Sequence, residues 1–230
     1  MCNTVFNNLK EILSKNYSGK ELIGFEGGFE SPFSSTEQAL YSLKAAIGKE
    51  EINIALDVAA SEFYENGKYN LENRIFTKSE LLEFYENLVK GFKIISIEDP
   101  FAEDDWQGWE AIMLKSKIQN PKLLIIGDDL TTTNIKRIKE AHNKNACNAV
   151  ILKLNQIGTV SETIEASKMA EVFGWKTIVS HRSGETVDSF IADLAVGTGA
   201  DFLKAGSPAK PERMVKYARL LEIEQELNKK

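Results

Sequence analysis

The chain has 230 residues, of which 43% are hydrophobic and 27% charged, and its 34 acidic residues against 28 basic ones give a net charge of −6. Such a composition is typical of one large globular domain. The scattered basic residues give no positive face for nucleic acid or an anionic membrane. No run of about 18 apolar residues and no secretion signal is visible, so we expect a cytoplasmic protein without a membrane span.

The cysteines, Cys2 and Cys147, are far apart in the chain and lie outside any CxxC pattern. This spacing argues against a disulfide framework and against a structural zinc site. We therefore expect two reduced thiols.

The first 50 residues predict a helix over residues 4–15, a glycine-rich loop, and a second helix near residues 36–47. After them, short apolar runs rich in β-branched residues alternate with segments of helical period. The helical segments are residues 79–90, 134–142 and 160–173. The predicted strands are residues 52–57, 94–98, 122–128, 149–154, 176–181 and 202–206. Apolar strands alternating with amphipathic helices predict an α/β fold with a parallel sheet covered by helices.

Each predicted strand ends at or near a polar or ionisable residue. These residues are Asp57, Glu98, Asp128, Lys153, His181 and Lys204. Such groups converge on one point only if the strands encircle it, as in a (β/α)₈ barrel. Because the sequence predicts about six strands where a barrel has eight, we expect an incomplete TIM-type barrel. No linker divides the chain, so we expect one domain over residues 1–230.

Three of these residues, Asp57, Glu98 and Asp128, are acids at the ends of successive strands. At a barrel mouth they would lie close together, and a bound cation would have to offset their repulsion. Carboxylate oxygens favour Mg²⁺ over zinc. The alternative is that each acid only caps the loop or helix that follows it.

Lys153 interrupts an apolar run, where an ammonium group is costly to bury unless it is paired. If it points into an acid-lined mouth, it is a candidate general base. The alternative is a lysine at the edge whose ammonium group reaches solvent.

His181, Arg182 and Ser183 form a cationic, hydrogen-bonding cluster typical of a phosphate or carboxylate site. Lys204 adds a second positive charge near the last strand. Glu26 lies between glycines on a loop and is a weaker candidate, because such a residue is usually a surface turn.

Several stretches of the chain closely resemble enolase, the phosphopyruvate hydratase of glycolysis. They occur in the order of that family and cover almost the whole sequence. The stretches include EGGF (26–29), LDVAASEFY (56–64), SIEDPF (96–101), GDDLT (127–131), LKLNQIG (152–158) and VSHRSGET (179–186). The chain departs from the family at Phe25, where enolases usually carry aspartate.

The resemblance implies Mg²⁺-dependent interconversion of 2-phosphoglycerate and phosphoenolpyruvate. By resemblance, Lys153 is the base that takes the proton from C2, and Glu26 helps the C3 hydroxide to leave. The remaining roles follow in the same way: Asp57, Glu98 and Asp128 as Mg²⁺ ligands, Arg182 and Ser183 as phosphate ligands, and His181 and Lys204 as further substrate contacts.

Enolases also carry a smaller α+β domain before the barrel, and the resemblance implies that this domain and the first two barrel strands are absent from the chain. We therefore expect the activity of the isolated chain to be impaired. The family implies a homodimer. A different hypothesis is a non-catalytic enolase remnant, on a cell surface or secreted, that binds a plasminogen-type partner through Lys229 and Lys230.

Overall fold

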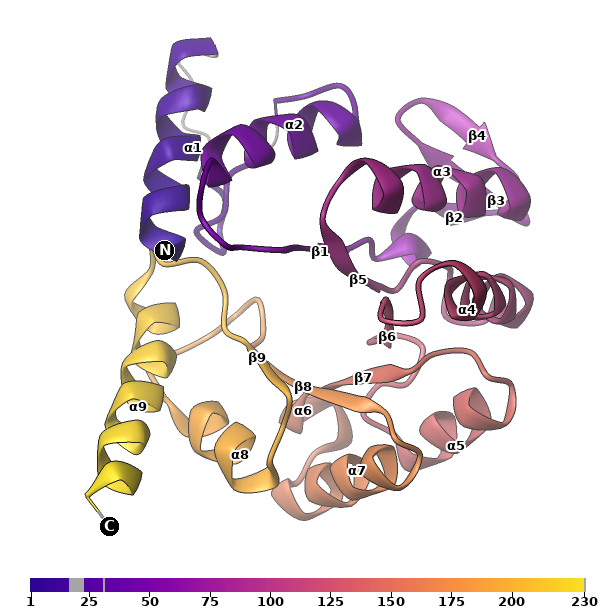
Figure 1. Ribbon diagram of the computed structural model, residues 1–230. Helices are drawn as coiled ribbons and strands as arrows, with labels where there is room; N and C mark the ends of the chain where they lie inside the picture. The colour runs from indigo at the N-terminus through magenta and orange to yellow at the C-terminus, as the bar shows by residue number, and fades with distance from the viewer. Residues whose placement is uncertain (17–22, 31, 230) are drawn as a thin grey trace. The chain divides into compact units, whose positions relative to one another are not determined.

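The computed structural model describes residues 1–16, 23–30 and 32–229 (Figure 1). The chain divides into two compact units. The first unit comprises Met1–Ile52, His181–Leu194 and Lys204–Lys230, and the second comprises Asn53–Ser180 and Ala195–Leu203.

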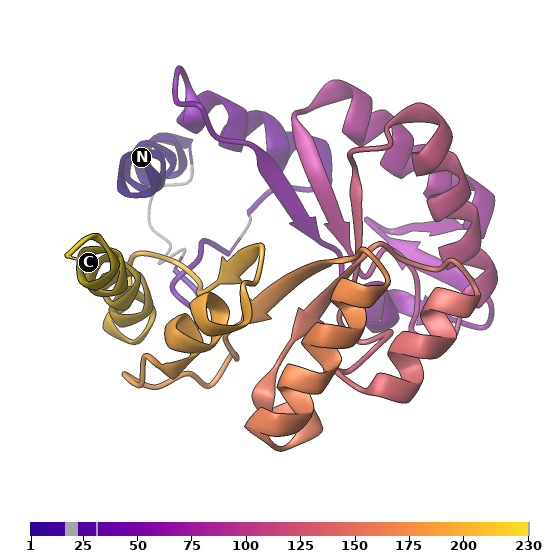
Figure 2. The ribbon, with the colours of Figure 1, turned by 60° about the horizontal axis from the view of Figure 1, so that its bottom comes forward.

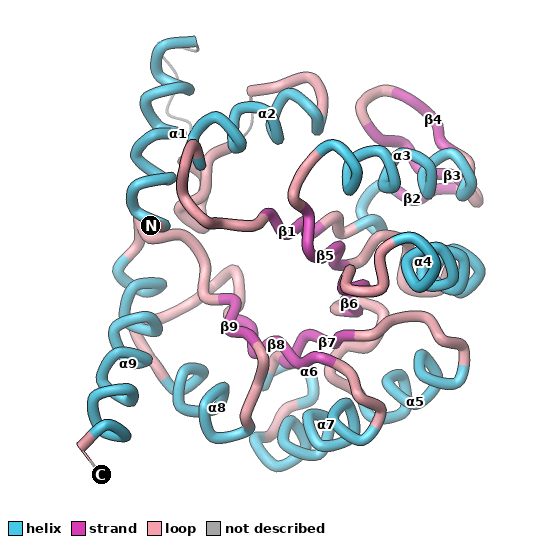
Figure 3. Tube along the Cα trace, in the orientation of Figure 1, coloured by secondary structure: helices cyan, strands magenta, loops and turns pink. Residues whose placement is uncertain are grey.

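The second unit contains a six-stranded sheet of order β1-β5-β6-β7-β8-β9, except for Lys204 at the end of β9, which belongs to the first unit. Its strands are β1 (Ile54–Asp57), β5 (Ile94–Glu98), β6 (Leu124–Gly127), β7 (Ala149–Leu152), β8 (Lys176–Ser180) and β9 (Phe202–Lys204). The pairings from β1 to β8 are parallel. The strands follow one another along an arc (Figure 3). Within the described residues, this confirms the predicted α/β fold with six strands of an incomplete TIM-type barrel.

Strand β7 shows why these runs become strands of a parallel sheet, since all four of its residues are buried. Burial on both faces requires consecutive apolar residues rather than an alternating pattern. Ala149 and Ile151 of β7 pack with Ile126 and Ile178 on one face, next to Leu124. The sheet therefore has a continuous apolar core from β6 to β8.

Helices follow the strands of the second unit and cover the outer side of the curved sheet (Figures 1 and 2). They are α3 (Lys78–Gly91), α4 (Trp106–Gln119), α5 (Ile135–Asn143), the short α6 (Leu154–Ile157) and α7 (Val160–Val172). Side-chain caps determine where several of them begin. Thr77 and Glu80 form a capping box at α3, and Thr159 accepts a hydrogen bond from the Glu162 amide at α7. These caps satisfy amide groups that have no partner inside the helix.

A small antiparallel sheet, order β2-β3-β4, lies in the connection between β1 and α3, and the sequence analysis did not predict it. Its strands are β2 (Tyr64–Glu65), β3 (Lys68–Leu71) and β4 (Arg74–Phe76), and the 3₁₀ helix η1 (Ala60–Phe63) precedes them. Tyr69 is fully buried; its hydroxyl donates to Asp105 Oδ2 at 2.8 Å and accepts the Ala102 amide at 3.1 Å. The hydroxyl thus ties the small sheet to the loop before α4.

The first unit contains α1 (Cys2–Asn16), α2 (Thr36–Ile47) and α9 (Pro211–Asn228), and α8 (Phe190–Thr198) begins in it. Helix α2 has the bounds that the sequence predicted. Cys2 and Cys147 are both free, as expected. Lys229 caps the end of α9, whereas Lys230 lies outside the described residues. Among the described helices, none has both the length and the apolar content needed to cross a membrane.

Candidate active site

The second unit places four predicted site residues at the same end of neighbouring strands. Asp57 and Glu98 are the last residues of β1 and β5 and are register partners across these strands. Asp128 directly follows β6, and Lys153 lies between β7 and α6. Because parallel strands present their carboxyl ends at one edge of a sheet, these residues share that edge.

The acid cluster, which we define as Asp99, Asp128 and Asp129, has one carboxylate oxygen of each residue within 4.8 Å of the others. Asp99 and Asp128 are buried, and Asp129 is half-buried. Burial raises the pKa of Asp129, and the charges of Asp128 and Asp57 raise it further while Lys153 lowers it. Asp57 therefore acts electrostatically on this cluster. Of the three acids that the sequence analysis selected, Asp128 belongs to the cluster, whereas Asp99 and Asp129 were not selected.

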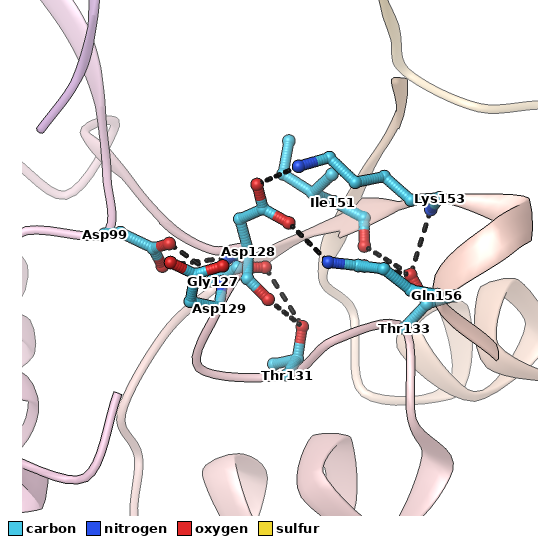
Figure 4. A network of polar contacts seen from close by, with 9 residues as sticks. All are labelled: Asp99, Gly127, Asp128, Asp129, Thr131, Thr133, Ile151, Lys153 and Gln156. Atoms are coloured by element: carbon cyan, nitrogen blue, oxygen red, sulfur yellow. Dashed lines mark hydrogen bonds and ion pairs between the residues drawn. The ribbon is translucent and has the colours of Figure 1, made fainter. Parts of the chain in front are cut away.

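Asp99 holds the turn that carries the other two acids (Figure 4). Its two carboxylate oxygens accept the amides of Asp128 at 2.9 Å and Asp129 at 2.8 Å. Its own amide donates to the carbonyl of Ile126, and its carbonyl accepts the amide of Ala60. The pKa of Asp99 is raised to about 8, because the effect of burial outweighs that of the two amides, which lower it. Both carboxylate oxygens, the amide and the carbonyl of Asp99 therefore all have hydrogen-bond partners.

The position of Asp99 could not be read from strand periodicity. Successive strand residues point to opposite faces, so a residue directly after Glu98 is expected to point away from it. Asp99 has φ of 43°, a left-handed conformation that aspartate tolerates better than most residues. The only signals in the sequence were the paired acids, Asp99 after Glu98 and Asp129 after Asp128.

Lys153 forms an ion pair with Asp128, and only 15% of the Lys153 side chain is exposed. Its amide donates to Thr133 Oγ1 at 2.9 Å, and Thr133 Oγ1 also contacts Gln156 Oε1 at 3.1 Å. Gln156 Nε2 donates to the other carboxylate oxygen of Asp128 at 3.4 Å. Figure 4 shows this network. The carboxylate of Asp128 offsets the free-energy cost of burying the ammonium group, as the sequence suggested. The role of Lys153 as a base stays a prediction.

The remaining predicted site residues gather in the first unit. The His181 amide donates to the Lys204 carbonyl at 2.8 Å. Ser207 Oγ donates to the Gly27 carbonyl at 2.7 Å and so fixes the loop that carries Glu26. The charges of Glu26 and Lys204 both act on His181.

Arg213 of α9, which the sequence analysis did not select, contacts His181 Nδ1. A guanidinium group can only donate, so Nδ1 accepts and the ring proton is on Nε2. Burial, followed by the Arg213 charge, lowers the pKa of His181 to about 4. His181 is therefore a neutral imidazole at neutral pH.

Residues 1–230 match a protein family described as the enolase C-terminal TIM barrel domain. The chain belongs to this family. The enolase assignment that the motifs suggested is thereby confirmed at the level of the domain.

The acids of this enolase domain fit a hard divalent cation. The donor set of the acid cluster consists of carboxylate oxygens alone, as Mg²⁺ prefers. Asp57 and Glu98 end the two adjacent strands and add carboxylates at the same edge of the sheet. Clustered negative charge of this kind requires a positive partner, and Lys153 supplies one such charge to Asp128.

Proposed function

We propose that this chain catalyses the reversible dehydration of 2-phospho-D-glycerate to phosphoenolpyruvate, a lyase reaction of glycolysis, with Mg²⁺ as cofactor. The contact between Lys153 and Asp128 carries the proposal, because it places a candidate base among carboxylates in a chain whose residues 1–230 match the enolase C-terminal domain family. A homodimer and a cytoplasmic location remain predictions of the same assignment.

The difficult step is removal of a proton from a carbon next to a carboxylate, since that carbon is a very weak acid. A divalent cation held by Asp57, Glu98 and Asp128 would supply positive charge where negative charge develops on the substrate carboxylate. As the neutral amine, Lys153 takes the proton from C2 and becomes an ammonium group, whose charge Asp128 stabilises. Its backbone and side chain are both held, by Thr133 and Asp128, so the amine is oriented before substrate arrives.

The enolase assignment, by resemblance, gives the roles at the phosphate and at the leaving hydroxide to Arg182, Ser183, His181, Lys204 and Glu26. Arg182 and Ser183 follow His181 on one segment, and we assign them to the phosphate because guanidinium, hydroxyl and amide groups are its usual ligands. Lys204 adds positive charge, and neutral His181 offers a donor at Nε2. Glu26 is the acid that assists departure of the C3 hydroxide, and its charge acts on His181 in this unit.

The test is the formation of phosphoenolpyruvate from 2-phosphoglycerate in the presence of Mg²⁺, followed by absorbance. Lys153→Ala should lower turnover by roughly 10²-fold or more, the usual loss when a general base is removed. Lys176→Ala is the matched control, because Lys176 also pairs with an aspartate, Asp201, but begins a strand instead of following one. An inactive wild-type chain, or equal turnover of Lys153→Ala and wild type, would overturn the proposal.

A further inference from the structure

Helix α9 carries two cations that are almost completely buried. Arg213 and Lys216 are each 1% exposed. Burying a cation costs free energy unless the cation is paired or fully hydrogen-bonded. The contacts of these two side chains must therefore offset that cost. Both side chains donate to the segment that follows β8, which we call the anion segment (residues 181–186).

Arg213 binds the first half of the anion segment through neutral acceptors. Its Nη1 donates to the Arg182 carbonyl at 2.7 Å and contacts His181 Nδ1, and its Nη2 donates to the Ser183 carbonyl at 2.8 Å. Its buried Nε has no hydrogen-bond partner. Within residues 1–16, 23–30 and 32–229, no carboxylate forms an ion pair with Arg213.

Lys216 binds the second half of the same segment in a different way. Its ammonium group donates to the carbonyls of Thr186 and Glu212 and lies 3.6 Å from Glu185 Oε2. Among the described residues, Lys216 therefore has an ion-pair partner, whereas the partners of Arg213 are neutral acceptors. The two residues make a matched pair of buried cations, of which only Arg213 touches His181.

The contacts of Arg213 determine which way the peptide groups of the anion segment face. In a trans peptide, the carbonyl of one residue and the amide of the next point in opposite directions. Because Arg213 holds the carbonyls of Arg182 and Ser183, the amides of Ser183 and Gly184 point away from α9. Successive amides presented in this way form an anion-binding surface.

The packing around Arg213 leaves little freedom for another arrangement. Gly206 has φ of 90°, and a Cβ there would lie 2.9 Å from Arg213 Cδ and 3.1 Å from His181 Cε1. Tyr217 of α9 donates to the Gly206 carbonyl at 2.7 Å. Only glycine fits between α9 and the ring of His181.

We propose that Arg213 is a positioning residue for anion binding: it turns the amides of Ser183 and Gly184 outward, fixes the proton of His181 on Nε2, and adds positive charge behind the anion segment. The inference rests on the proposed function, which assigns Arg182 and Ser183 to the substrate phosphate. The ligand class is a phosphate monoester, and inorganic phosphate is the probe.

The first measurement does not depend on the reaction. The chain has two histidines, so a pH titration of the ring protons by NMR, assigned with His142→Gln, reports His181 directly. The charges that act on His181 are those of Arg213, Glu26, Lys204 and Glu185. In Arg213→Met, the pKa of His181 should rise by about 1 unit or more, because a like charge has been removed.

Lys216→Met is the control for loss of a buried cation from the same helix. It should leave the pKa of His181 close to the wild-type value, since Lys216 does not contact the ring. An unchanged pKa of His181 in folded Arg213→Met, or an equal rise in Lys216→Met, would overturn the proposal.

The second measurement is the affinity for inorganic phosphate. It is obtained from the same ring-proton signals as phosphate is added to each variant. Arg213→Met should weaken it by about tenfold or more, the scale of one lost charge-assisted interaction, and Lys216→Met by less than roughly threefold. If Arg213→Met does not fold, Arg213→Lys replaces it. That variant keeps the charge but not the two-pronged donation, so the pKa of His181 should stay low while phosphate binding weakens.

Wild-type phosphate affinity in Arg213→Lys would overturn the positioning role. A wild-type chain that binds no phosphate would instead contradict the phosphate assignment of the proposed function, while the titration of His181 would still test the contact with Arg213.

Discussion

The ion pair between Lys153 and Asp128 is nearly buried, with 15% and 9% of the two side chains exposed. Lys153→Met keeps the length and apolar contacts of the side chain but removes its charge. Asp128 would then keep the donor Gln156 at 3.4 Å, while Asp99 and Asp129 remain close by. Removing one partner of a buried pair costs about 3–5 kcal/mol. We expect the lower end, about 3 kcal/mol, because both side chains retain some contact with solvent.

Urea unfolding without Mg²⁺, followed by fluorescence of the 3 tryptophans, measures this loss. Asp128→Asn alone should also destabilise the chain, since it leaves the nearly buried Lys153 ammonium group without its carboxylate. The double variant should be less destabilised than the sum of the two, by about 0.5–3 kcal/mol. Additive effects would refute the view that the two side chains depend on each other.

Mg²⁺ provides a second check on the same pair. If the acids hold the cation, Mg²⁺ should stabilise Lys153→Met at least as much as wild type, by about 2.7 kcal/mol at a hundredfold excess over Kd. Lys176→Met, which breaks the exposed pair with Asp201, should cost at most about 1 kcal/mol and leave the Mg²⁺ response unchanged. Loss of the Mg²⁺ response in Lys153→Met would contradict the argument.

Three further variants test other parts of the structure. Asp57→Asn should abolish the rise in thermal stability caused by Mg²⁺, and an unchanged rise would remove Asp57 from the metal site. Gly206→Ala should cost about 1–3 kcal/mol in urea unfolding, because its Cβ would meet Arg213 Cδ at 2.9 Å; a neutral effect would show that α9 can shift. Tyr69→Phe should cost about 2 kcal/mol, because it removes the hydroxyl that Asp105 and the Ala102 amide share, and an unchanged urea midpoint would mean that water replaces it.

Local sequence was enough to predict those parts of the chain whose structure depends on nearby residues. The six apolar runs became the six strands of the sheet, and residues 36–47 became α2 with the same bounds. Strands of a parallel sheet are buried on both faces, so they require consecutive apolar residues. Such runs can be recognised in the sequence alone. The position of Lys153 after such a run also predicted that it needed a charged partner, and Asp128 is that partner.

Tertiary structure alone decided the contacts that depend on backbone conformation or on distant segments. Asp99 enters the acid cluster because its φ is positive, which strand alternation cannot anticipate. Arg213 reaches His181 across a separation of 32 residues in sequence, and nothing in the helical pattern of α9 distinguishes it from a surface arginine. The sequence therefore identified candidate residues from their neighbours along the chain, whereas the partners that orient them come from segments that only folding brings together.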